Sequence, residues 1–428
     1  MVLYNADLHF HSPYAIGCSR STTIPILAKE AKKKGLNLLT TADILHNKWL
    51  AHVKDNLLEE DGCYFYKEDK QLPKEKRTYF LLGGELESKQ RVHHLLYYRN
   101  FEELAKFRKK LEPFSPDINK ESGGRPRLSI DSEGLLNLCL ENNILIGPAH
   151  VFTPYFGVYA HYDSLKEAYG KNYTQIKFLE LGLSADTNLA NKIPELKNIK
   201  FFSFSDSHSP MSHRIGREYV CLDLEKPNYD CFEKMLNDKG NNHIAYNVGF
   251  NPEEGKYNRT ACKDCAQIYS MEDAEKNKYR CLVCKGIVKK GVSDRGKEIA
   301  IAQGNKDLKQ LIERPEYKFL IPLAQLIQIA IKQKNIEHRT VIEKYNLFIE
   351  KHTELDIMLT TPEEELEKIE PIIAKYIISA RNNLIVFKPG GAGFYGEPNF
   401  CFSKEEKETK QEEINEKIRK RVEQKTLF

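Results

Sequence analysis

The chain has 428 residues, which is enough for two or three domains. Hydrophobic residues make up 41% of it and charged residues 29%, as in ordinary globular proteins. A formal net charge of only +4 excludes nucleic-acid binding driven by overall charge, so any basic surface must be local. No segment resembles a signal peptide or an apolar membrane span of about twenty residues, which favours a cytoplasmic protein without membrane contact.

The first part of the chain alternates between predicted strands and helices. The patterns predict, in chain order, a strand at 2–6, a helix at 24–34, a strand at 36–41, a helix at 101–111, a capped helix at 131–141 and a strand at 144–146. Residues 50–77 are charged and irregular, and residues 115–127 are rich in Pro, Gly and charge, so both are expected outside regular structure. The alternation is typical of an α/β barrel rather than a sandwich or a bundle.

The first predicted strand leads into alternating polar and apolar residues. Asp7, His9 and His11 would share one face of an extended strand, with Leu8 and Phe10 on the other. Imidazole and carboxylate groups are suitable ligands for a divalent metal ion. The alternative is a surface strand that carries two histidines near a terminus.

Further metal-ligand residue types follow later apolar runs. They are Asp43, His46, Glu85, His93, His150, Glu180, Asp206 and His208. One such residue alone would more often be a satisfied polar group at a strand end. Together they predict one site at the rim of a parallel sheet or barrel.

Four of the ten cysteines form two C-x-x-C pairs, Cys262 with Cys265 and Cys281 with Cys284. This spacing is typical of a four-cysteine zinc ribbon or knuckle. Four sulfur ligands leave no open position for water, so we expect a structural zinc ion. The flanks at 256–259 and 285–295 are basic, which is consistent either with a phosphate-facing surface or with a solvated rim.

Helical spacing follows over residues 304–387, interrupted by prolines. The glycine-rich run at 387–396 lacks the ending of a P-loop, so it predicts either a close approach to a DNA backbone or a plain turn. Residues 403–420 form a strongly charged, helical stretch, after which the chain reaches Gln-Lys-Thr-Leu-Phe.

The metal-ligand series resembles the PHP (polymerase and histidinol phosphatase) superfamily, in which a distorted (β/α)7 barrel holds up to three metal ions and hydrolyses phosphoesters. The motifs that carry the resemblance are Asp-Leu-His-Phe-His-Ser at 7–12, Thr-Ala-Asp at 41–43, Gly-Glu at 84–85, His93, Pro-Ala-His at 148–150 and Ser-Asp-Ser-His at 205–208. The match departs at 15–19, which reads Ala-Ile-Gly-Cys-Ser where many members carry a further histidine or aspartate.

The resemblance also implies roles for individual residues. The residues implied to bind two of the ions are His9, His11, Glu85, His93, His150 and Asp206. Glu85 would bridge these ions, while Asp43 or His46, together with His208, would serve a third. Asp206, Glu85 and His9 are the expected catalytic residues, with Zn, Mg or Mn as the expected ions.

The order of the elements narrows the resemblance to endonuclease Q, a family of lesion-specific DNA nucleases best known from archaea. It implies a PHP barrel at 1–250, a zinc element at 251–295, a helical DNA-binding region at 296–400 and a charged tail at 401–428. It further implies incision 5′ to uracil, hypoxanthine, xanthine or an abasic site by a monomeric, nucleoid-associated enzyme that extrudes the damaged nucleotide.

The last residues resemble a clamp-binding peptide of the Gln-x-x-Leu-Phe kind. Gln424, Leu427 and Phe428 would contact a sliding clamp (PCNA), since apolar residues at the end of a charged tail are costly unless something covers them. Two rival functions remain open at this point. One is a PHP phosphatase of a small phosphate ester, and the other is a non-catalytic PHP scaffold in a nucleic-acid-binding protein.

Overall fold

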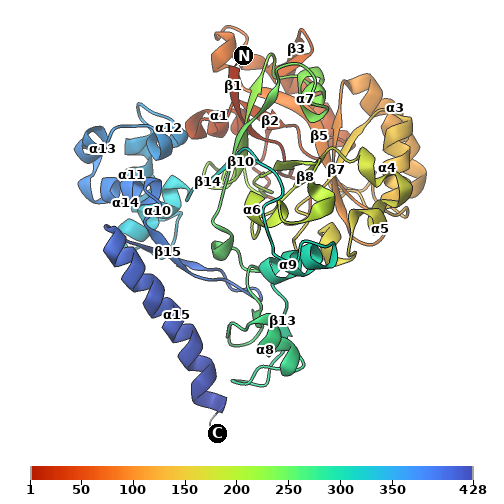
Figure 1. The fold of residues 1–428 in the computed structure, drawn as a ribbon. Coiled ribbons are helices and arrows are strands. Elements are labelled where there is room, and N and C mark those ends of the chain that lie inside the picture. Colours follow the sequence, from red (N-terminus) through yellow and green to blue (C-terminus); the bar gives the residue numbers. More distant parts are fainter. Residues whose placement is uncertain (1, 427–428) are drawn as a thin grey trace.

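A computed structural model describes residues 2–426, with side chains as far as residue 418, and has a mixed α/β fold (Figure 1). The strands are β1 (Val2–Asp7), β2 (Leu38–Thr40), β3 (Leu57–Glu60), β4 (Cys63–Tyr66), β5 (Tyr79–Glu87), β6 (His93–Tyr98), β7 (Leu145–Pro148), β8 (Phe178–Glu180), β9 (Lys200–Phe202), β10 (Tyr219–Leu224), β11 (His243–Gly249), β12 (Ala261–Cys262), β13 (Val288–Lys289), β14 (Glu316–Phe319), β15 (Ile385–Lys388) and β16 (Glu397–Phe400). The expected mixed α/β class is confirmed.

The helices cover this strand-rich part and follow it in the chain. They are α1 (Ile24–Lys34), α2 (Asn47–Asn56), α3 (Phe101–Leu111), α4 (Ser132–Glu141), α5 (Leu165–Tyr169), α6 (Thr187–Ala190), α7 (Tyr229–Leu236), α8 (Met271–Lys276), α9 (Val292–Ala302), α10 (Leu323–Ala330), α11 (Arg339–Phe348), α12 (Glu354–Leu359), α13 (Glu363–Ile369), α14 (Pro371–Arg381) and α15 (Lys404–Thr426). Helix α1 begins and ends at the predicted residues, because Thr23 caps its first turn and Gly35 ends it with a φ of 99°.

Seven strands make up what we call the strand ring: β1, β2, β5, β6 and β7 belong to one larger sheet, and β8 and β9 form a separate two-stranded sheet beside it. Strand β1 pairs in parallel with β2, and β2 pairs in parallel with β5. Strands β5, β6 and β7 pair antiparallel, while β8 and β9 pair in parallel. The pairing is therefore mixed, and the expectation of repeated parallel units holds for only part of the ring.

Hydrogen bonds beyond the strand ends link the remaining neighbours of the strand ring. The Val151 amide after β7 donates to the Glu180 carbonyl of β8 at 2.8 Å, and the Asp206 amide after β9 donates to the His9 carbonyl after β1 at 2.9 Å. Strands β7 and β8 approach so closely that a Cβ atom at Gly147 would lie 2.4 Å from the Phe178 carbonyl oxygen. A glycine is required there. Segments far apart in the sequence are thus brought to one rim.

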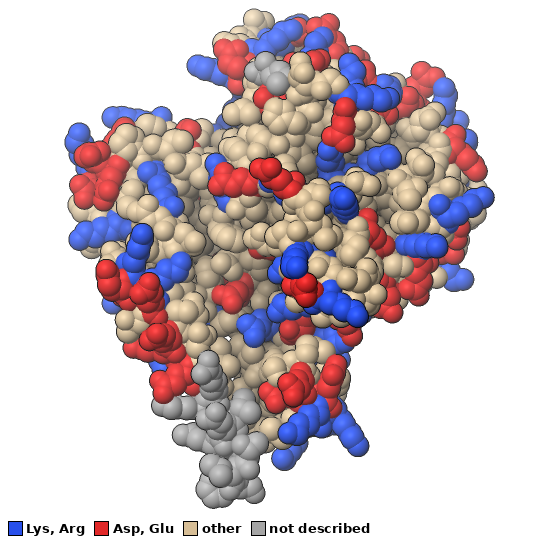
Figure 2. All heavy atoms as spheres, viewed as in Figure 1, with Lys and Arg blue, Asp and Glu red and all other residues tan. Residues whose placement is uncertain are grey.

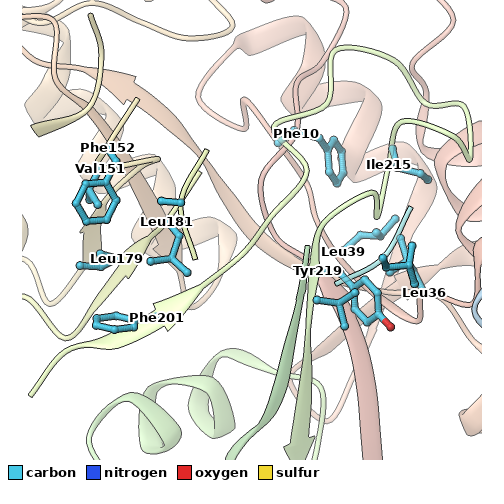
Figure 3. Packing of buried hydrophobic residues seen from close by; sticks show 14 of the residues in the cluster. Phe10, Leu36, Leu39, Val151, Phe152, Leu179, Leu181, Phe201, Ile215 and Tyr219 are labelled. Carbon is cyan, nitrogen blue, oxygen red and sulfur yellow. The ribbon is translucent and has the colours of Figure 1, made fainter. Parts of the chain in front are cut away.

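Apolar side chains fill the space between the strand ring and its helices. Figure 3 shows two groups of them, one with Leu36, Leu39, Ile215 and Tyr219 near Phe10, and another with Val151, Phe152, Leu179, Leu181 and Phe201. Phe10 of the first group lies between His9 and His11 in the chain, and Val151 and Phe152 of the second group directly follow His150. Close packing on both sides holds these segments rigidly.

Three features differ from the sequence predictions. Residues 50–77, expected to be irregular, contain the end of α2 and the β3–β4 hairpin, whose β4 pairs with β5. Residues 316–319, expected in a helical region, form β14, which pairs in parallel with β11. Residues 385–400, in the same region, form the β15–β16 hairpin. In each case the strand depends on a partner that local sequence does not reveal.

The C-terminal part contains the cysteine element (residues 251–295), the helical region (α10 to α14) and the long helix α15, which projects from the rest in Figure 1. Figure 2 shows acidic and basic side chains interspersed over one face of the molecule, so the described part of that face carries no continuous basic band. Within residues 2–426, no helix has the length and apolar character needed to cross a membrane.

Candidate metal centre

Two histidines that follow β1 face a carboxylate that follows β9. The Nε2 atoms of His11 and His9 lie 3.3 Å and 3.7 Å from Oδ1 of Asp206. Ligand atoms of these three residues all lie within 4.8 Å of one another. Both Nε2 atoms are buried and have no hydrogen-bond partner among the residues described. Buried, unpartnered imidazole nitrogens beside a carboxylate fit a divalent cation.

The backbone brings these residues together differently from the predicted strand. Strand β1 ends at Asp7, and His9 and His11 lie in the segment beyond it. Asp7 accepts hydrogen bonds from the amides of Ser205 and Gly216 at 3.1 Å and 2.8 Å, and so lies outside the metal group. The prediction that Asp7 shares a face with the two histidines is wrong, because the strand stops before the alternation continues.

A second group contains Glu85 of β5, His93 of β6 and His150 after β7. Oε1 of Glu85 lies 2.8 Å from Nδ1 of His93 and 3.1 Å from Nε2 of His150. All three residues are buried. This set of one carboxylate and two imidazoles matches the ligand chemistry of a second divalent ion.

Glu85 joins the two groups. Its Oε1 lies 3.5 Å from Nε2 of His9, and its Oε2 lies 3.5 Å from Nε2 of His11. A carboxylate placed between two sets of histidines can hold one oxygen toward each of two ions. The six residues named for two ions are therefore brought together at one rim.

Carboxylates outside these groups contact the remaining nitrogens of three histidines. Nδ1 of His9 lies 2.8 Å from Glu180, Nδ1 of His11 lies 3.1 Å from Asp43, and Nε2 of His93 lies 3.2 Å from Glu87. Such contacts fix the tautomer and the ring orientation of a metal-binding histidine. Oε2 of Glu180 also accepts a hydrogen bond from the backbone amide of His150 at 2.9 Å, so one carboxylate positions residues of both groups.

The residues expected at a third ion are arranged less favourably for metal binding than the residues of the two groups. Both ring nitrogens of His46 are engaged, because Nδ1 accepts a hydrogen bond from the Trp49 amide at 3.4 Å and Nε2 lies 3.2 Å from the Lys120 carbonyl oxygen. His46 is the N-cap of α2, and the prediction that it is a ligand is not supported. Asp43 bonds His11 and the Ser12 amide. His208 is exposed and packs 4.7 Å from the ring of His11.

Three residues at this rim have left-handed backbone conformations. The φ angles are 26° at Asp43, 27° at His150 and 46° at Asp206. Such conformations are costly for residues other than glycine and cluster at functional sites. Here they turn the chain where it leaves the ends of β2, β7 and β9. The spacing of two between Asp206 and His208 predicts that they share one strand face, but the turn at Asp206 leaves both residues outside a strand.

The charges of the centre are strongly coupled. Burial alone would raise the pKa of Glu85, but His93, Arg125 and His9 outweigh it and hold this pKa well below its usual range. Burial likewise opposes ionisation of Asp206, but His9 and His11 lower its pKa. Both carboxylates are therefore ionised at neutral pH, as metal ligands must be.

The cysteine element brings its four sulfur atoms together. The Sγ atoms of Cys262, Cys265, Cys281 and Cys284 all lie within 4.8 Å of one another. Tetrahedral zinc with Zn–S bonds of about 2.3 Å separates its sulfurs by about 3.8 Å, so the cluster has the size of a zinc site. The hydroxyl of Tyr269 donates a hydrogen bond to the Cys281 sulfur at 3.2 Å, which stabilises a thiolate.

The chain is similar to the crystal structure of the lesion-specific endonuclease PfuEndoQ from Pyrococcus furiosus, with 36% identity and a TM-score of 0.85 over 93% of this chain and 96% of that chain. The chain belongs to the endonuclease Q family. A structure of endonuclease Q in complex with a 27-mer duplex substrate, with an abasic lesion at the active site, matches with 36% identity and a TM-score of 0.84 over 94% of this chain and 97% of that chain.

Two further proteins are similar in sequence. Uncharacterized protein MJ0043 of Methanocaldococcus jannaschii is 37% identical over 252 residues, which are 58% of this chain but only 31% of that protein. Uncharacterized protein YqxK of Bacillus subtilis is 29% identical over 412 residues, covering 91% of this chain and 98% of that protein. Residues 322–384 match the family model of the MJ0043 C-terminal domain. In this endonuclease Q family member, that match spans helices α10 to α14.

The sequence patterns indicate Glu180 without giving it a role, and they do not indicate Glu87 or Arg125. Glu87 could have been found, because it follows Glu85 at a spacing of two on the same strand. Nη1 of Arg125 donates a hydrogen bond to Oε2 of Glu85 at 3.2 Å, from a loop in which no pattern singles it out.

Two further loops belong to this endonuclease Q family fold. Residues 151–159, directly after His150, form a loop with four aromatic side chains. Phe152 and Tyr159 are buried, Phe156 stacks 4.5 Å from the ring of His93, and only Tyr155 of the four is strongly exposed. The glycine-rich run forms the turn between β15 and β16. The amides of Gly390, Gly393 and Gly396 donate hydrogen bonds to carbonyl oxygens of residues 253–256, so these amides hold the cysteine element rather than face a phosphate.

Proposed function

We propose that the chain is a metal-dependent DNA repair endonuclease that hydrolyses the phosphodiester 5′ to a damaged nucleotide. The damage would be an abasic site or a deaminated base such as uracil, hypoxanthine or xanthine. The observation that carries the proposal is the position of Glu85 between two histidine groups, in a chain similar over 94% of its length to an endonuclease Q bound to abasic DNA.

The residues of the chain suit a pair of divalent ions, Zn, Mg or Mn. His9, His11 and Asp206 would hold one ion, His93 and His150 the other, and Glu85 would contact both. Ions bound there supply Lewis acidity at the scissile phosphate and lower the pKa of a bound water molecule. Asp43 or His46 with His208 was the expected third set, and the engaged nitrogens of His46 leave only Asp43 and His208 for it.

Side chains of the centre have distinct positions relative to solvent. The side chain of Asp206 is 31% exposed, whereas those of Glu85, His9 and His11 are at most 1% exposed. Asp206 is therefore the residue of this set that a substrate can reach from solvent. We assign it a direct catalytic role, and Glu85 and His9 would act in catalysis through the ions that they hold.

The rest of the proposal follows the same resemblance. The strand ring would be a PHP barrel within residues 1–250, and the four cysteines would hold a structural zinc ion within residues 251–295. Residues 296–400 would contact DNA. In the tail at 401–428, Gln424 falls within α15, while Leu427 and Phe428 lie outside the described residues. Binding of a sliding clamp by these three residues remains a proposal.

The test uses end-labelled duplex DNA with one abasic site, uracil, hypoxanthine or xanthine, incubated with Mg²⁺ or Mn²⁺. We expect cleavage directly 5′ to the lesion by the native protein, and neither cleavage of undamaged DNA nor cleavage by the variant Asp206→Ala. Absence of cleavage with every lesion and both metals would contradict the proposal. Hydrolysis of a simple phosphomonoester instead would favour the phosphatase.

A further inference from the structure

The guanidinium of Arg125 contacts the carboxylate that joins the two histidine groups. Its Nη1 atom donates a hydrogen bond to Oε2 of Glu85 at 3.2 Å. The side chain of Arg125 is 26% exposed, whereas that of Glu85 is fully buried. Of this pair, Arg125 is therefore the residue that a substrate arriving from solvent can contact.

The backbone that carries Arg125 is fixed without help from its guanidinium. The Gly124 amide donates to the Tyr14 carbonyl at 3.1 Å, and the Leu128 amide donates to the Glu87 carbonyl at 2.8 Å. A Cβ atom at Gly124 would lie 2.6 Å from the Ala15 amide nitrogen, so the loop approaches this segment as closely as glycine permits. Arg125 is thus presented on a rigid loop, and its side chain is not needed to hold that loop.

The donors of Arg125 are largely unused. A guanidinium has five N–H donors, yet that of Arg125 makes one hydrogen bond to the described part of the chain. Two arginines with structural roles in the same protein make more hydrogen bonds. Arg314 makes four such bonds and Arg381 makes three, all but one of them to backbone carbonyl oxygens. The Arg125 side chain is only partly buried, with 26% of it exposed, so its free donors are available to a ligand that supplies the acceptors.

The aromatic ring of Phe156 also lies near the guanidinium of Arg125. It stacks 4.5 Å from the ring of His93, and the guanidinium carbon of Arg125 lies 5.8 Å from its centroid. Arg91 lies over the same ring at 4.7 Å, but its side chain is 60% exposed and contacts Glu87 rather than Glu85. The two arginines carry the same charge at one ring, and only Arg125 reaches the carboxylate that joins the two groups.

We propose that Arg125 is a catalytic residue that binds a non-bridging oxygen of the scissile phosphodiester. This inference rests on the proposed nuclease function. Hydrolysis forms a bond between phosphorus and a water oxygen and breaks one phosphorus–oxygen ester bond, and the water proton is transferred to the leaving oxygen. Negative charge on the phosphoryl oxygens is greatest during this exchange, and a planar guanidinium that remains charged stabilises it through paired hydrogen bonds.

A purely structural role makes a different prediction. If Arg125 only balanced the charge of Glu85, its loss would change metal binding and stability rather than the rate of cleavage by the loaded enzyme. Bound metal and the rate of a single turnover therefore have to be measured on the same preparations.

The experiment compares Arg125→Ala, Arg125→Lys and Arg91→Ala in the full-length, metal-loaded protein, on duplex DNA with one abasic site. For Arg125→Ala we expect unchanged bound metal, DNA affinity within about tenfold of the native value, and a single-turnover rate lower by about 100-fold or more. Arg125→Lys should keep part of the rate, and guanidinium ion added to the buffer should restore part of it to Arg125→Ala. Arg91→Ala should stay within about threefold, because an exposed charge at this distance is screened.

Equal rates for Arg125→Ala and Arg91→Ala would overturn the inference while leaving the nuclease function in place. Loss of bound metal in parallel with activity would assign Arg125 a structural role and would also overturn it. If the native protein cleaves no lesion, the proposed function fails, and the inference fails with it.

Discussion

The ammonium group of Lys34 lies 2.6 Å from Oε1 of Glu354, and both side chains are fully buried. Lys34 is the last residue of α1 beside the strand ring, and Glu354 is the first residue of α12 in the helical region. Glu354 also accepts hydrogen bonds from the Leu323 amide and the Tyr345 hydroxyl, both at 2.9 Å. A buried charge pair therefore links the helical region to α1 beside the strand ring, and both carboxylate oxygens of Glu354 have partners.

Loss of either partner should destabilise the protein strongly. Lys34→Met or Glu354→Ala leaves one buried charge without its counterpart, which typically costs about 3 to 5 kcal/mol. The matched control is Lys33→Met, because Lys33 pairs with Glu30 at the same distance of 2.6 Å but is 34% exposed. Urea unfolding should show a change below about 1 kcal/mol for the control. Equal effects at the two lysines would show that burial of the pair does not matter.

Glu180 should be needed for metal affinity although it belongs to neither metal group. Glu180→Ala removes the acceptor for His9 Nδ1 and for the His150 amide, so both histidines lose their orientation. Removal of such a partner typically weakens metal binding by about 10- to 100-fold. Titration with Mn²⁺ followed by calorimetry would measure the change. Glu195→Ala, which removes a carboxylate bonded to Tyr159 and Leu165, is the control and should leave Mn²⁺ affinity unchanged.

The cysteine element should lose its metal independently of the strand ring. Cys281→Ser removes one of four clustered sulfurs, so we expect one zinc ion fewer per chain and easier proteolysis within residues 251–295. Cys63→Ser changes a cysteine of β4, which is not part of the cysteine element, and should keep the full zinc content. Metal analysis of both proteins after dialysis would decide. A full zinc content in Cys281→Ser would exclude the four-cysteine site.

Glu218 should make stability depend on pH. Burial raises its pKa from 4.5 to about 8 in the folded protein, and the Phe250 amide only partly opposes this. Between these values the folded state keeps a proton that the unfolded state releases, so this group lowers stability as the pH rises from 4.5 to about 8. Each unit of the shift is worth about 1.4 kcal/mol.

Glu218→Gln keeps an acceptor for the Phe250 amide and removes the titration. Its stability relative to the native protein should therefore increase with pH across this window. Urea unfolding midpoints at several pH values from 5 to 8.5, in about half-unit steps, would measure the difference. Parallel curves for the two proteins would show that Glu218 is not protonated in the folded state.

The terminal peptide should be required for binding to a sliding clamp. Deletion of residues 424–428 is expected to abolish binding to the clamp in surface plasmon resonance and to leave cleavage of abasic DNA by the free enzyme unchanged. Gln411→Ala, a change at a polar residue earlier in α15, is a suitable control and should retain binding. Undiminished binding after the deletion would place the contact elsewhere.

Local sequence signals were sufficient to predict the helices whose N-cap residues can be recognised in the sequence. Helix α3 and the cap of α4 lie at the predicted residues, because Asn100 and Asp131 each accept a hydrogen bond in the first turn. Strand β14 was missed because its partner β11 lies far back in the chain, and three of its four residues are charged or polar-tipped. No local pattern reports such a pairing.

The same difference between local signals and long-range contacts applies to the metal centre. Candidate ligands were identifiable because histidine, aspartate and glutamate at strand ends are suited to metals whatever lies opposite, and the resemblance to the PHP superfamily separated the six residues of the two groups from the other candidates. The roles of Glu180 and Arg125 were not identifiable, because each depends on which residue faces it across the fold. His46 shows the converse case, since its residue type suits a metal while its Nδ1 atom caps a helix.

Strand β14 also limits how far the chain can be truncated from its C-terminal side. Because β14 pairs with β11, the cysteine element lies between two adjacent strands of one sheet and is an insertion rather than an appendage. A truncation near residue 250 would uncover the backbone N–H and C=O groups of β11 as a new sheet edge, and such edges promote aggregation. The shortest soluble fragment with an intact metal centre should therefore extend at least through Phe319. The protein is then one folding unit, although its sequence suggests a series of separable parts.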